Sequence, residues 1–348
     1  MMMPLNKPLL ASLSALLLLA GLPAATRAAD CPARSQQGEM TLVSFADRSI
    51  AVRGHLHVNP DGMPASYLPG DHGFTYIVNG VDLWVGGQRR SCQTNRDECK
   101  AKFREAEAGG FGPGTAEFCA FALEVDPPQA GGTTQACTRG RVIGNGRGRP
   151  RIGGQLPTAA GGQTDFYASM TALTQLVEGK PRPLDAGLLP SVVVPVSQPG
   201  TLGRVVWVRH GERSTFAVVG DTGPAYGEGS VALHELLRHG ALSGQKPGPI
   251  PLAQRCTAIE TGLRAPFISR PDLAGDRCSD AGARRGPADI RAYQGIAAGV
   301  TQLILGRARV EMKGSVAQQP LSVEQLRVVA EAAGYDATKL SEMARCVE

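Results

Sequence analysis

The sequence predicts a mainly β fold, a barrel-like or otherwise compact β domain with helices added, so that the whole is α+β. Turns are expected to be many, because 44 of the 348 residues are Gly and 25 are Pro. Short β-branched runs stand between these turn signals, as is typical of strands. Helical periodicity is scarce before residue 230 and clear near the C-terminus.

Five runs indicate individual strands, since β-branched and aromatic side chains pack well on a pleated surface. The expected strands are Thr41 to Phe45, Ser191 to Val196, Arg204 to Val208, Thr215 to Val219, and a run on which His55 and His57 alternate. Gly211 suits a tight turn between the third and fourth of these, which predicts a β-hairpin. Pro195 predicts an edge or a bulge at the end of its strand.

The helices are expected late in the chain, with one exception. Residues 92–108 are charged and helix-favouring, and glycines end them. Near the C-terminus Ser322 and Gln325 match a capping box, and Asp336 suits the N-cap of a last helix. Residues 127–164 are rich in Pro, Gly, Thr and Gln and predict a long loop or linker. We therefore expect a main domain over 29–310 and a helical C-terminal extension over 311–348.

The first 28 residues have the layout of a secretory signal peptide. Lys7 supplies a positive charge, an apolar stretch runs from Leu9 to Leu19, and small residues at Thr26 and Ala28 precede an expected cut before Ala29. The apolar stretch is too short for a membrane span. The sequence therefore predicts a secreted or periplasmic protein, with no membrane partner after cleavage.

The cysteines predict disulfides. Eight is an even number, and an exported chain meets an oxidising environment. They are Cys31, Cys92, Cys99, Cys119, Cys137, Cys256, Cys278 and Cys346. No two of them form a CxxC pair and no histidine adjoins one, so neither zinc nor another cofactor is expected. A bridge at Cys346, two residues from the end, would hold the C-terminal tail in place.

The charge pattern argues against a nucleic-acid partner. The net charge of the full chain is +5, without the blocks of Lys and Arg that such partners require. The basic run over residues 141–151 contains Gly and Pro and is expected to be a flexible loop.

Two carboxylates stand out in residues 215–237. Asp221 follows an apolar strand, and Glu228 lies between two glycines, ahead of a helix that Ser230 is suited to cap. A strand end and a helix start are rigid supports, so the turn between them can bring both acids to one cleft. Hydrolysis of a glycosidic bond needs such a pair: one acid protonates the leaving oxygen, and the other, ionised, activates water or attacks the sugar. The structural alternative is a turn residue and a residue that complements a helix dipole.

The stretch from Asp165 to Leu237 resembles glycoside hydrolase family 75, the chitosanases first described in fungi and also found in bacterial genomes. The matching pieces are FYASMTAL (166–173), LPSVVVP (189–195) and AVVGDTGPAYGEGSVALHELL (217–237), and HVNPDGMPASYLPGDHGF (57–74) is similar to a segment of bacterial members. GDTGP with GEGS is the most specific part. The matches cover residues 57–237 with gaps.

The resemblance implies a secreted hydrolase that cleaves β-1,4 bonds of an amino-sugar polysaccharide by an inverting mechanism. It makes Asp221 and Glu228 the catalytic pair, with Glu228 favoured as the acid, and assigns 29–310 as the catalytic domain. Ser169 and Thr171 become candidates for substrate contact, and Tyr226 for stacking on a sugar ring.

The chain departs from the family in three respects. Its Asp-to-Glu interval is 7 residues, shorter than in fungal members. The sequence past residue 240 differs from the family, with a cysteine-containing insertion and the helical tail. Chitosan is polycationic, so a positively charged protein would need a locally acidic cleft to bind it.

Other functions stay open. The site could act on peptidoglycan, or the protein could bind carbohydrate without catalysis, with Trp84 as a second stacking candidate. The string RHGE at Arg209–Glu212 matches the opening motif of histidine phosphatases. The hairpin expected there, and the fewer than 140 residues that follow, argue against His210 as a phosphoryl acceptor. His55 and His57 share a strand face but lack a third metal ligand nearby, and His234 is expected to be a packed histidine.

Overall fold

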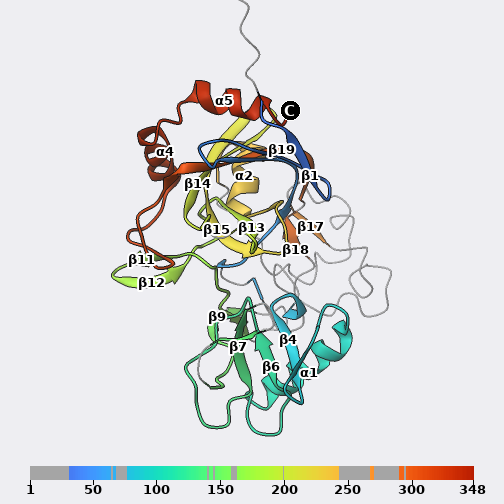
Figure 1. Ribbon diagram of the computed structural model, residues 1–348. Coiled ribbons are helices and arrows are strands. Elements are labelled where there is room, and N and C mark those ends of the chain that lie inside the picture. The colour runs from blue at the N-terminus through green and yellow to red at the C-terminus, as the bar shows by residue number, and fades with distance from the viewer. Residues whose placement is uncertain are drawn as a thin grey trace, which may run out of the picture. The chain divides into compact units, whose positions relative to one another are not determined.

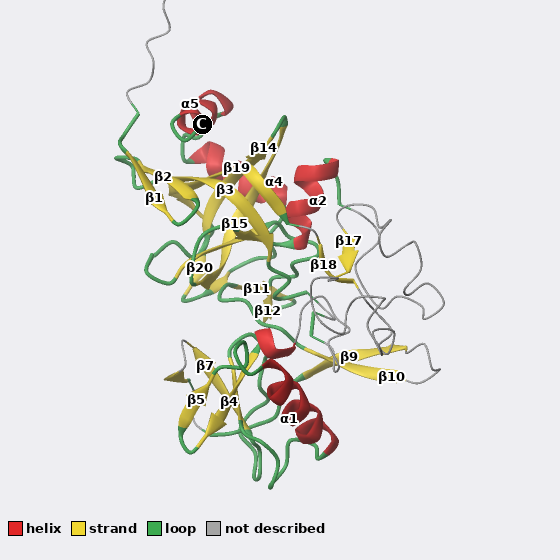
Figure 2. Ribbon diagram, turned by 90° about the vertical axis from the view of Figure 1, so that its right-hand side faces the viewer, coloured by secondary structure: helices red, strands yellow, loops and turns green. Residues whose placement is uncertain are grey.

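Strands dominate the computed structural model (Figure 1, Figure 2). It describes residues 31–63, 66–67, 77–138, 141–143, 146–157, 163–198, 200–242, 267–269, 290–293 and 295–348. The predicted signal peptide, Cys256 and Cys278 lie outside the described residues. No helix in the described ranges is both long and apolar enough to cross a membrane.

Six of the described strands close into a barrel (Figure 1). In order around it they are β3 (Ile50–Val58), β16 (Glu228–Gly229), β13 (Ser191–Pro195), β15 (Arg213–Gly223), β14 (Arg204–His210) and β19 (Ile296–Arg309). The pairing of β3 with β19 completes the ring. β1 (Arg34–Gln37) and β2 (Met40–Ser44) extend the sheet beyond β3. The predicted mainly β fold is confirmed, and the five expected strands lie in β2, β3, β13, β14 and β15.

The hairpin between β14 and β15 also forms as predicted. His210 pairs with Arg213, and Gly211 in the turn has a positive φ of 58°. β19 was not predicted. It pairs with β14 on one side and β3 on the other, and Val300, Leu303 and Ile304 within it are fully buried.

The helices begin at predicted caps or charged runs. They are α1 (Arg96–Ala108), α2 (Val231–His239), α4 (Val323–Ala332) and α5 (Ala337–Arg345), with a short 3-10 turn, η2 (Ile77–Asn79). The side chains of Ser230, Ser322 and Asp336 each accept the backbone N–H three residues ahead, so these three N-caps are confirmed.

Both faces of the barrel wall are covered by apolar side chains. Val206 and Val219 belong to a buried cluster that includes leucines of α2. Val205 and Val218, their neighbours in sequence, belong to a second cluster formed with α4 and α5. Successive residues of a strand point to opposite faces, so each strand contributes to both clusters. The C-terminal helices therefore form part of the core that supports the barrel.

A smaller sheet lies beside α1 (Figure 2). Its strands are β5 (Gln88–Arg90), β4 (Val81–Val85), β6 (Phe118–Ala120), β7 (Thr134–Thr138) and β8 (Arg141–Val142). Phe103 of α1 packs edge-on against Phe118 and Tyr167, with ring centroids 5.4 Å apart in both pairs.

The prediction of a loop or linker over residues 127–164 was wrong. This segment holds β7, β8, β9 (Ile152–Pro157) and the start of β10 (Gln163–Tyr167). β7 pairs in parallel with β6, and the Cys119–Cys137 disulfide joins the same two strands. The Cys119–Cys137 disulfide and the pairing with β6 hold β7 in the sheet, although the composition of this segment indicated turns.

The remaining strands are short. β12 (Lys180–Pro183), β11 (Thr174–Val177), β21 (Val316–Ala317) and β20 (Met312–Lys313) form one sheet, and β17 (Phe267–Ser269) pairs with β18 (Ile290–Tyr293). The parallel pairing of β11 with β21 links the middle of the chain to the segment ahead of the C-terminal helices.

Three disulfides confirm the interpretation of the cysteines. They are Cys31–Cys346, Cys92–Cys99 and Cys119–Cys137. Cys31–Cys346 spans 315 residues of sequence and holds the C-terminal segment, as the position of Cys346 predicted. Bridges of this kind persist in oxidising compartments, outside the reducing cytoplasm.

The disulfides predict a graded loss of stability. Replacing Cys31 and Cys346 with Ala should lower the free energy of unfolding more than replacing Cys92 and Cys99, because a crosslink over 315 residues restricts the unfolded chain more than one over 7. The chain-entropy model gives a difference of about 3 kcal/mol. Urea unfolding of both double variants measures it, and equal losses would contradict the entropic account.

Candidate active site

Asp221 and Glu228 lie on two barrel strands that flank the same residue. Val193 of β13 pairs with Asp221 of β15 on one side and with Glu228 of β16 on the other. Glu228 pairs in turn with His57 of β3. Paired residues of neighbouring strands direct their side chains to the same face. Asp221, Val193, Glu228 and His57 therefore form a line across four strands, which we call the carboxylate row.

A bulge aligns Asp221 with this row. The sequence predicted that the strand would end before Gly220, but β15 continues to Gly223. The register shifts between Val192 and Val193, so that Val192 pairs with Val219 and Val193 pairs with Asp221, and Gly220 is skipped. A bulge of this kind re-aims the side chain that follows it. Asp221 consequently shares a face with Val193.

Glu228 joins the row because the residue before it is glycine. Gly227 has a φ of 98°, which only glycine adopts without strain. A Cβ at this position would lie 2.8 Å from Nε2 of His55, so any side chain would collide with the ring. The turn can thus pass close to β3 and deliver Glu228 into the gap between β13 and β3.

Ser230 fixes the other end of this short strand. Its Oγ accepts the backbone N–H of Ser191 at 3.0 Å and that of Leu233 at 3.2 Å, and it donates to the carbonyl of Leu189 at 2.9 Å. One hydroxyl therefore joins the start of α2 to β13. The helix cap predicted from sequence also supports the position of Glu228.

The carboxylate row lines a cleft of about 720 Å³. Other described lining residues come from the loop after β3, from the end of β7, and from the segment that follows β10. Among them are Asn59, Asp61, Tyr67, Met170, Thr171 and Ala172.

Asp61 is a third carboxylate in the cleft, and the sequence did not predict it. Tyr67 Oη donates a hydrogen bond to Asp61 Oδ1 at 2.8 Å. The backbone N–H of Asp61 donates to Asn59 Oδ1 at 2.8 Å, and Asn59 Nδ2 donates to Glu228 Oε2 at 3.4 Å. The Asn59 side chain thus connects the turn that carries Asp61 to the carboxylate of Glu228.

The cleft is acidic although the chain as a whole is basic. Asp61, Asp221 and Glu228 line it, and no Lys or Arg occurs among its described lining residues. The net charge of the chain, +5, therefore resides elsewhere. A ligand in this cleft meets a negative local field, which attracts cationic groups.

Burial shifts all three carboxyl groups toward their protonated forms. It raises the pKa of Asp221 to about 6, although Asp221 Oδ1 accepts the N–H groups of Thr222 at 2.8 Å and Ala172 at 3.2 Å. Burial also raises the pKa of Glu228, which the Asn59 hydrogen bond opposes. The pKa of Asp61 is well above its usual range, first through burial and then through the nearby charge of Asp221.

Of the three residues predicted to contact substrate, only Thr171 lines the cleft. Thr171 lines the cleft, but its hydroxyl is used locally, accepting the N–H of Leu184 at 3.0 Å. Ser169 is buried beneath the turn after Asp61, where its Oγ accepts the N–H of Gly62 at 2.9 Å. Tyr226 is 3% exposed and packs in the apolar cluster with α2, so its ring does not reach the cleft.

None of the described histidines belongs to a metal site, although His57 lines the cleft. The rings of His55 and His57 lie 4.2 Å apart, and in the described part of the chain no three His, Cys, Asp or Glu residues form a group that could hold a metal ion. His210 ends β14 in the hairpin. Both ring nitrogens of His234 lie 2.9 Å from backbone carbonyl oxygens, of Ser230 and of Leu56. His234 is therefore a packed histidine.

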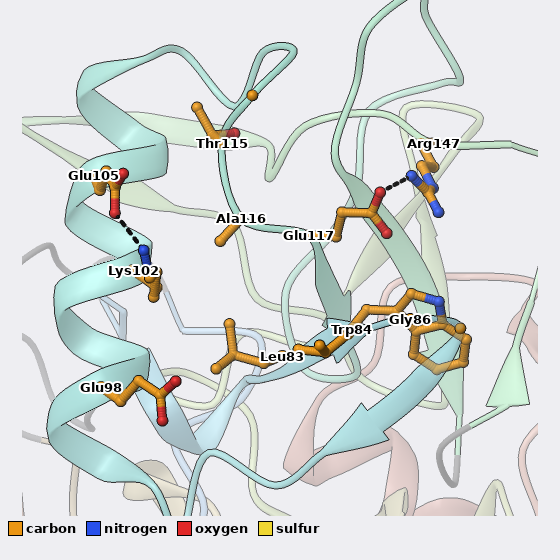
Figure 3. A pocket seen from close by; sticks show the side chains of 13 residues that line it. Leu83, Trp84, Gly86, Glu98, Lys102, Glu105, Thr115, Ala116, Glu117 and Arg147 are labelled. Carbon is orange, nitrogen blue, oxygen red and sulfur yellow. Dashed lines mark hydrogen bonds and ion pairs between the residues drawn. The ribbon is translucent and has the colours of Figure 1, made fainter.

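Trp84 lines a separate pocket of about 540 Å³ beside α1 (Figure 3). Its charged groups are paired: Lys102 with Glu105 at 2.9 Å, Arg147 with Glu117, and Glu98 with Arg90. Exposed pairs of this kind contribute little energy. The pocket has an aromatic ring but no free carboxylate pair, so it lacks the groups that the cleft brings together.

The sequence thus predicted two of the three cleft carboxylates. Asp61 and Tyr67 lie in the segment over 57–74 that is similar to bacterial members of family 75, but neither was predicted to be a site residue, because Asp before Gly62 by itself indicates a turn. No protein-family model matches the chain, and no curated protein was found to match it. The likeness to glycoside hydrolase family 75 stays a prediction.

The raised pKa of Asp221 makes stability depend on pH. A folded-state pKa of about 6 exceeds the ordinary value of 3.8, so ionising Asp221 costs the folded protein up to about 3 kcal/mol. The loss of stability is absent below pH 3.8, the ordinary pKa. It grows as the pH rises from 3.8 to about 6, the folded-state pKa, and is complete above that pH.

Asp221→Asn should therefore be more stable than the wild type at about pH 8, with the difference vanishing at about pH 4. Urea unfolding at both pH values measures this. Glu212→Gln, which removes an exposed acid in the hairpin turn, is the control. An equal stability change at the two pH values would show that Asp221 ionises normally in the folded state.

Proposed function

We propose that the protein is a secreted glycoside hydrolase of the chitosanase type, which cleaves β-1,4 bonds of an amino-sugar polysaccharide with inversion. The carboxylate row carries this proposal, because it presents Asp221 and Glu228 on one face of the cleft with Val193 between them. The resemblance of the GDTGP and GEGS segments to family 75 supports the same two residues.

The spacing of the acids supports an inverting mechanism. Asp221 and Glu228 are two strands apart, so their Cα atoms are on the order of 10 Å apart at the usual spacing of about 4.8 Å between strands. Inverting enzymes hold their carboxyl groups about 6.5–9.5 Å apart, to leave room for water, whereas retaining enzymes need only about 5 Å. A Cα spacing of two strands leaves room for the carboxyl separation of an inverting enzyme, and the anomer of the first product tests that mechanism.

The surroundings of the two acids favour Asp221 as the general acid, the reverse of the assignment expected from sequence. Asp221 keeps its proton up to about pH 6. When it is protonated, Oδ1 can act as the carbonyl oxygen that accepts two backbone N–H groups, which leaves Oδ2–H to donate. Glu228 has an Asn59 hydrogen bond and the charge of His55, which both favour its ionised form.

The reaction then follows from these positions. Water between the acids gives a proton to Glu228 as its oxygen attacks the anomeric carbon from the face opposite the leaving group. Asp221 donates its proton to the glycosidic oxygen as that bond breaks. The product has the opposite anomeric configuration, and exchange of protons with solvent restores both acids.

The charge of the cleft supports an amino-sugar polymer as the substrate. A basic protein repels a polycation unless the contact surface is acidic, and the described lining of this cleft contains carboxylates without Lys or Arg. The predicted signal peptide and the disulfides support action outside the cytoplasm.

Both acids should be required for activity. Asp221→Asn and Glu228→Gln should each lower the rate of reducing-end release from partly acetylated chitosan by about 10²–10⁴-fold, because each removes one proton-transfer step. Glu212→Gln should retain wild-type activity. Nuclear magnetic resonance should detect the α-anomer as the first product.

Two results would contradict the proposal. Soluble products from purified cell wall, with none from chitosan, would identify a peptidoglycan hydrolase. Retained binding of polysaccharide without new reducing ends would identify a carbohydrate-binding protein.

The assignment of the acid predicts the pH profile. If Asp221 donates the proton, the rate should fall as pH rises through about 6, because the acid is then lost. In Asp221→Asn the residual rate should lack this alkaline limb. A limb that persists in Asp221→Asn and disappears in Glu228→Gln would restore Glu228 as the acid.

A further inference from the structure

We propose that Asp61 binds the ammonium group of a glucosamine unit in the cleft and thereby selects deacetylated over acetylated sugar. The choice of substrate rests on the proposed function. Cleavage with inversion needs two carboxyl groups, which Asp221 and Glu228 supply. The cleft nevertheless contains a third, on a separate loop and outside the carboxylate row.

The hydrogen bonds of Asp61 leave one oxygen for a ligand. Oδ1 accepts from Tyr67 Oη at 2.8 Å, and Oδ2 has no hydrogen-bond partner among the described residues. The side chain is half-buried and lines the cleft. An ammonium group in the cleft can therefore donate to Oδ2 while Tyr67 keeps the carboxylate in place.

The described lining of the cleft carries negative charge without a compensating positive side chain, which favours a cationic ligand. Three carboxyl groups share it, and Asp221 and Glu228 both disfavour the ionised form of Asp61. No Lys or Arg in the described lining compensates them. A ligand that brings its own positive charge relieves this repulsion and forms a charge-assisted hydrogen bond. A glucosamine unit does both, whereas an N-acetylated unit is neutral and leaves the repulsion between the carboxyl groups uncompensated.

The described residues beside Asp61 are closely packed. Gly62 has a φ of 86°, and a Cβ there would lie 1.8 Å from the carbonyl oxygen of Leu184. The N–H of Gly62 donates to Ser169 Oγ, and Tyr67 is 2% exposed and bridges to Tyr167. A carboxylate held in this way loses little conformational entropy when a ligand binds, which favours affinity and selectivity.

Binding without turnover tests the proposal. Calorimetry would compare a glucosamine hexamer with an N-acetylglucosamine hexamer, using Asp221→Asn as the parent and Asp61→Asn in addition. The Asp61 change should weaken binding of the glucosamine hexamer about tenfold or more, the loss typical of a hydrogen bond to a charged group, and leave the acetylated hexamer unchanged. Glu212→Gln in the same parent is the charge-matched control.

The number of protons released on binding distinguishes direct contact of Asp61 with the ligand from a purely structural role of Asp61. Burial and the nearby charge of Asp221 raise the pKa of Asp61 and so favour its protonated form, so binding an ammonium group should release a proton, and Asp61→Asn should abolish that release. Titration in two buffers of different ionisation heat measures it. Tyr67→Phe keeps the Asp61 carboxyl group but removes the hydrogen bond to it. This variant should bind the glucosamine hexamer several-fold more weakly and still release the proton.

The outcomes distinguish this inference from the proposed function. Equal weakening of both hexamers by Asp61→Asn, or unchanged affinity for both, overturns the role of Asp61 even if the wild type cleaves chitosan. A further outcome is a wild type that cleaves no chitosan while Asp61→Asn still weakens only the binding of the glucosamine hexamer. That result would support the ammonium site and contradict the proposed hydrolase activity.

Discussion

The candidate site depends on the pairing of β13 with a strand on each side. β15 delivers Asp221 and β16 delivers Glu228, and both pair with Val193. The distance between the acids is therefore a property of sheet geometry, set by two strand spacings. β16 consists of only two residues, which are held in the sheet by Gly227 before them and Ser230 after them. A change at either neighbour would alter the spacing of the acids without touching a carboxylate.

The same architecture explains why the chain can tolerate an acidic cleft. Ionised carboxyl groups without a counter-charge oppose folding, and burial strengthens that effect. The barrel wall supplies the compensating stability through apolar clusters on both faces, one with α2 and one with α4 and α5. The C-terminal helices thus belong to the core that provides this stability.

Sequence reasoning succeeded where local pattern decides the structure. The β-branched strands, the Gly211 hairpin and the caps at Ser230, Ser322 and Asp336 all form as predicted. It failed where distant segments decide. β19 closes the barrel against a strand roughly 250 residues earlier, and its apolar run lacks the strict alternation that would separate a strand from a helix. Asp61 and Tyr226 show the same limit at the site: the first enters the cleft through loop packing, and the second turns into the core although it lies between the two acids in sequence.

The Cys31–Cys346 disulfide protects the C-terminal helix from local unfolding and so from proteolysis. Glu348, beyond the bridge, forms ion pairs with Arg53 of β3 and Arg209 of β14. The carboxyl end is thus fastened both to the start of the folded chain and to the barrel wall. Peeling α5 away would require a covalent bond to break or the first strands to move with it. Fastened in this way, α5 resists the local unfolding that cleavage by a protease requires.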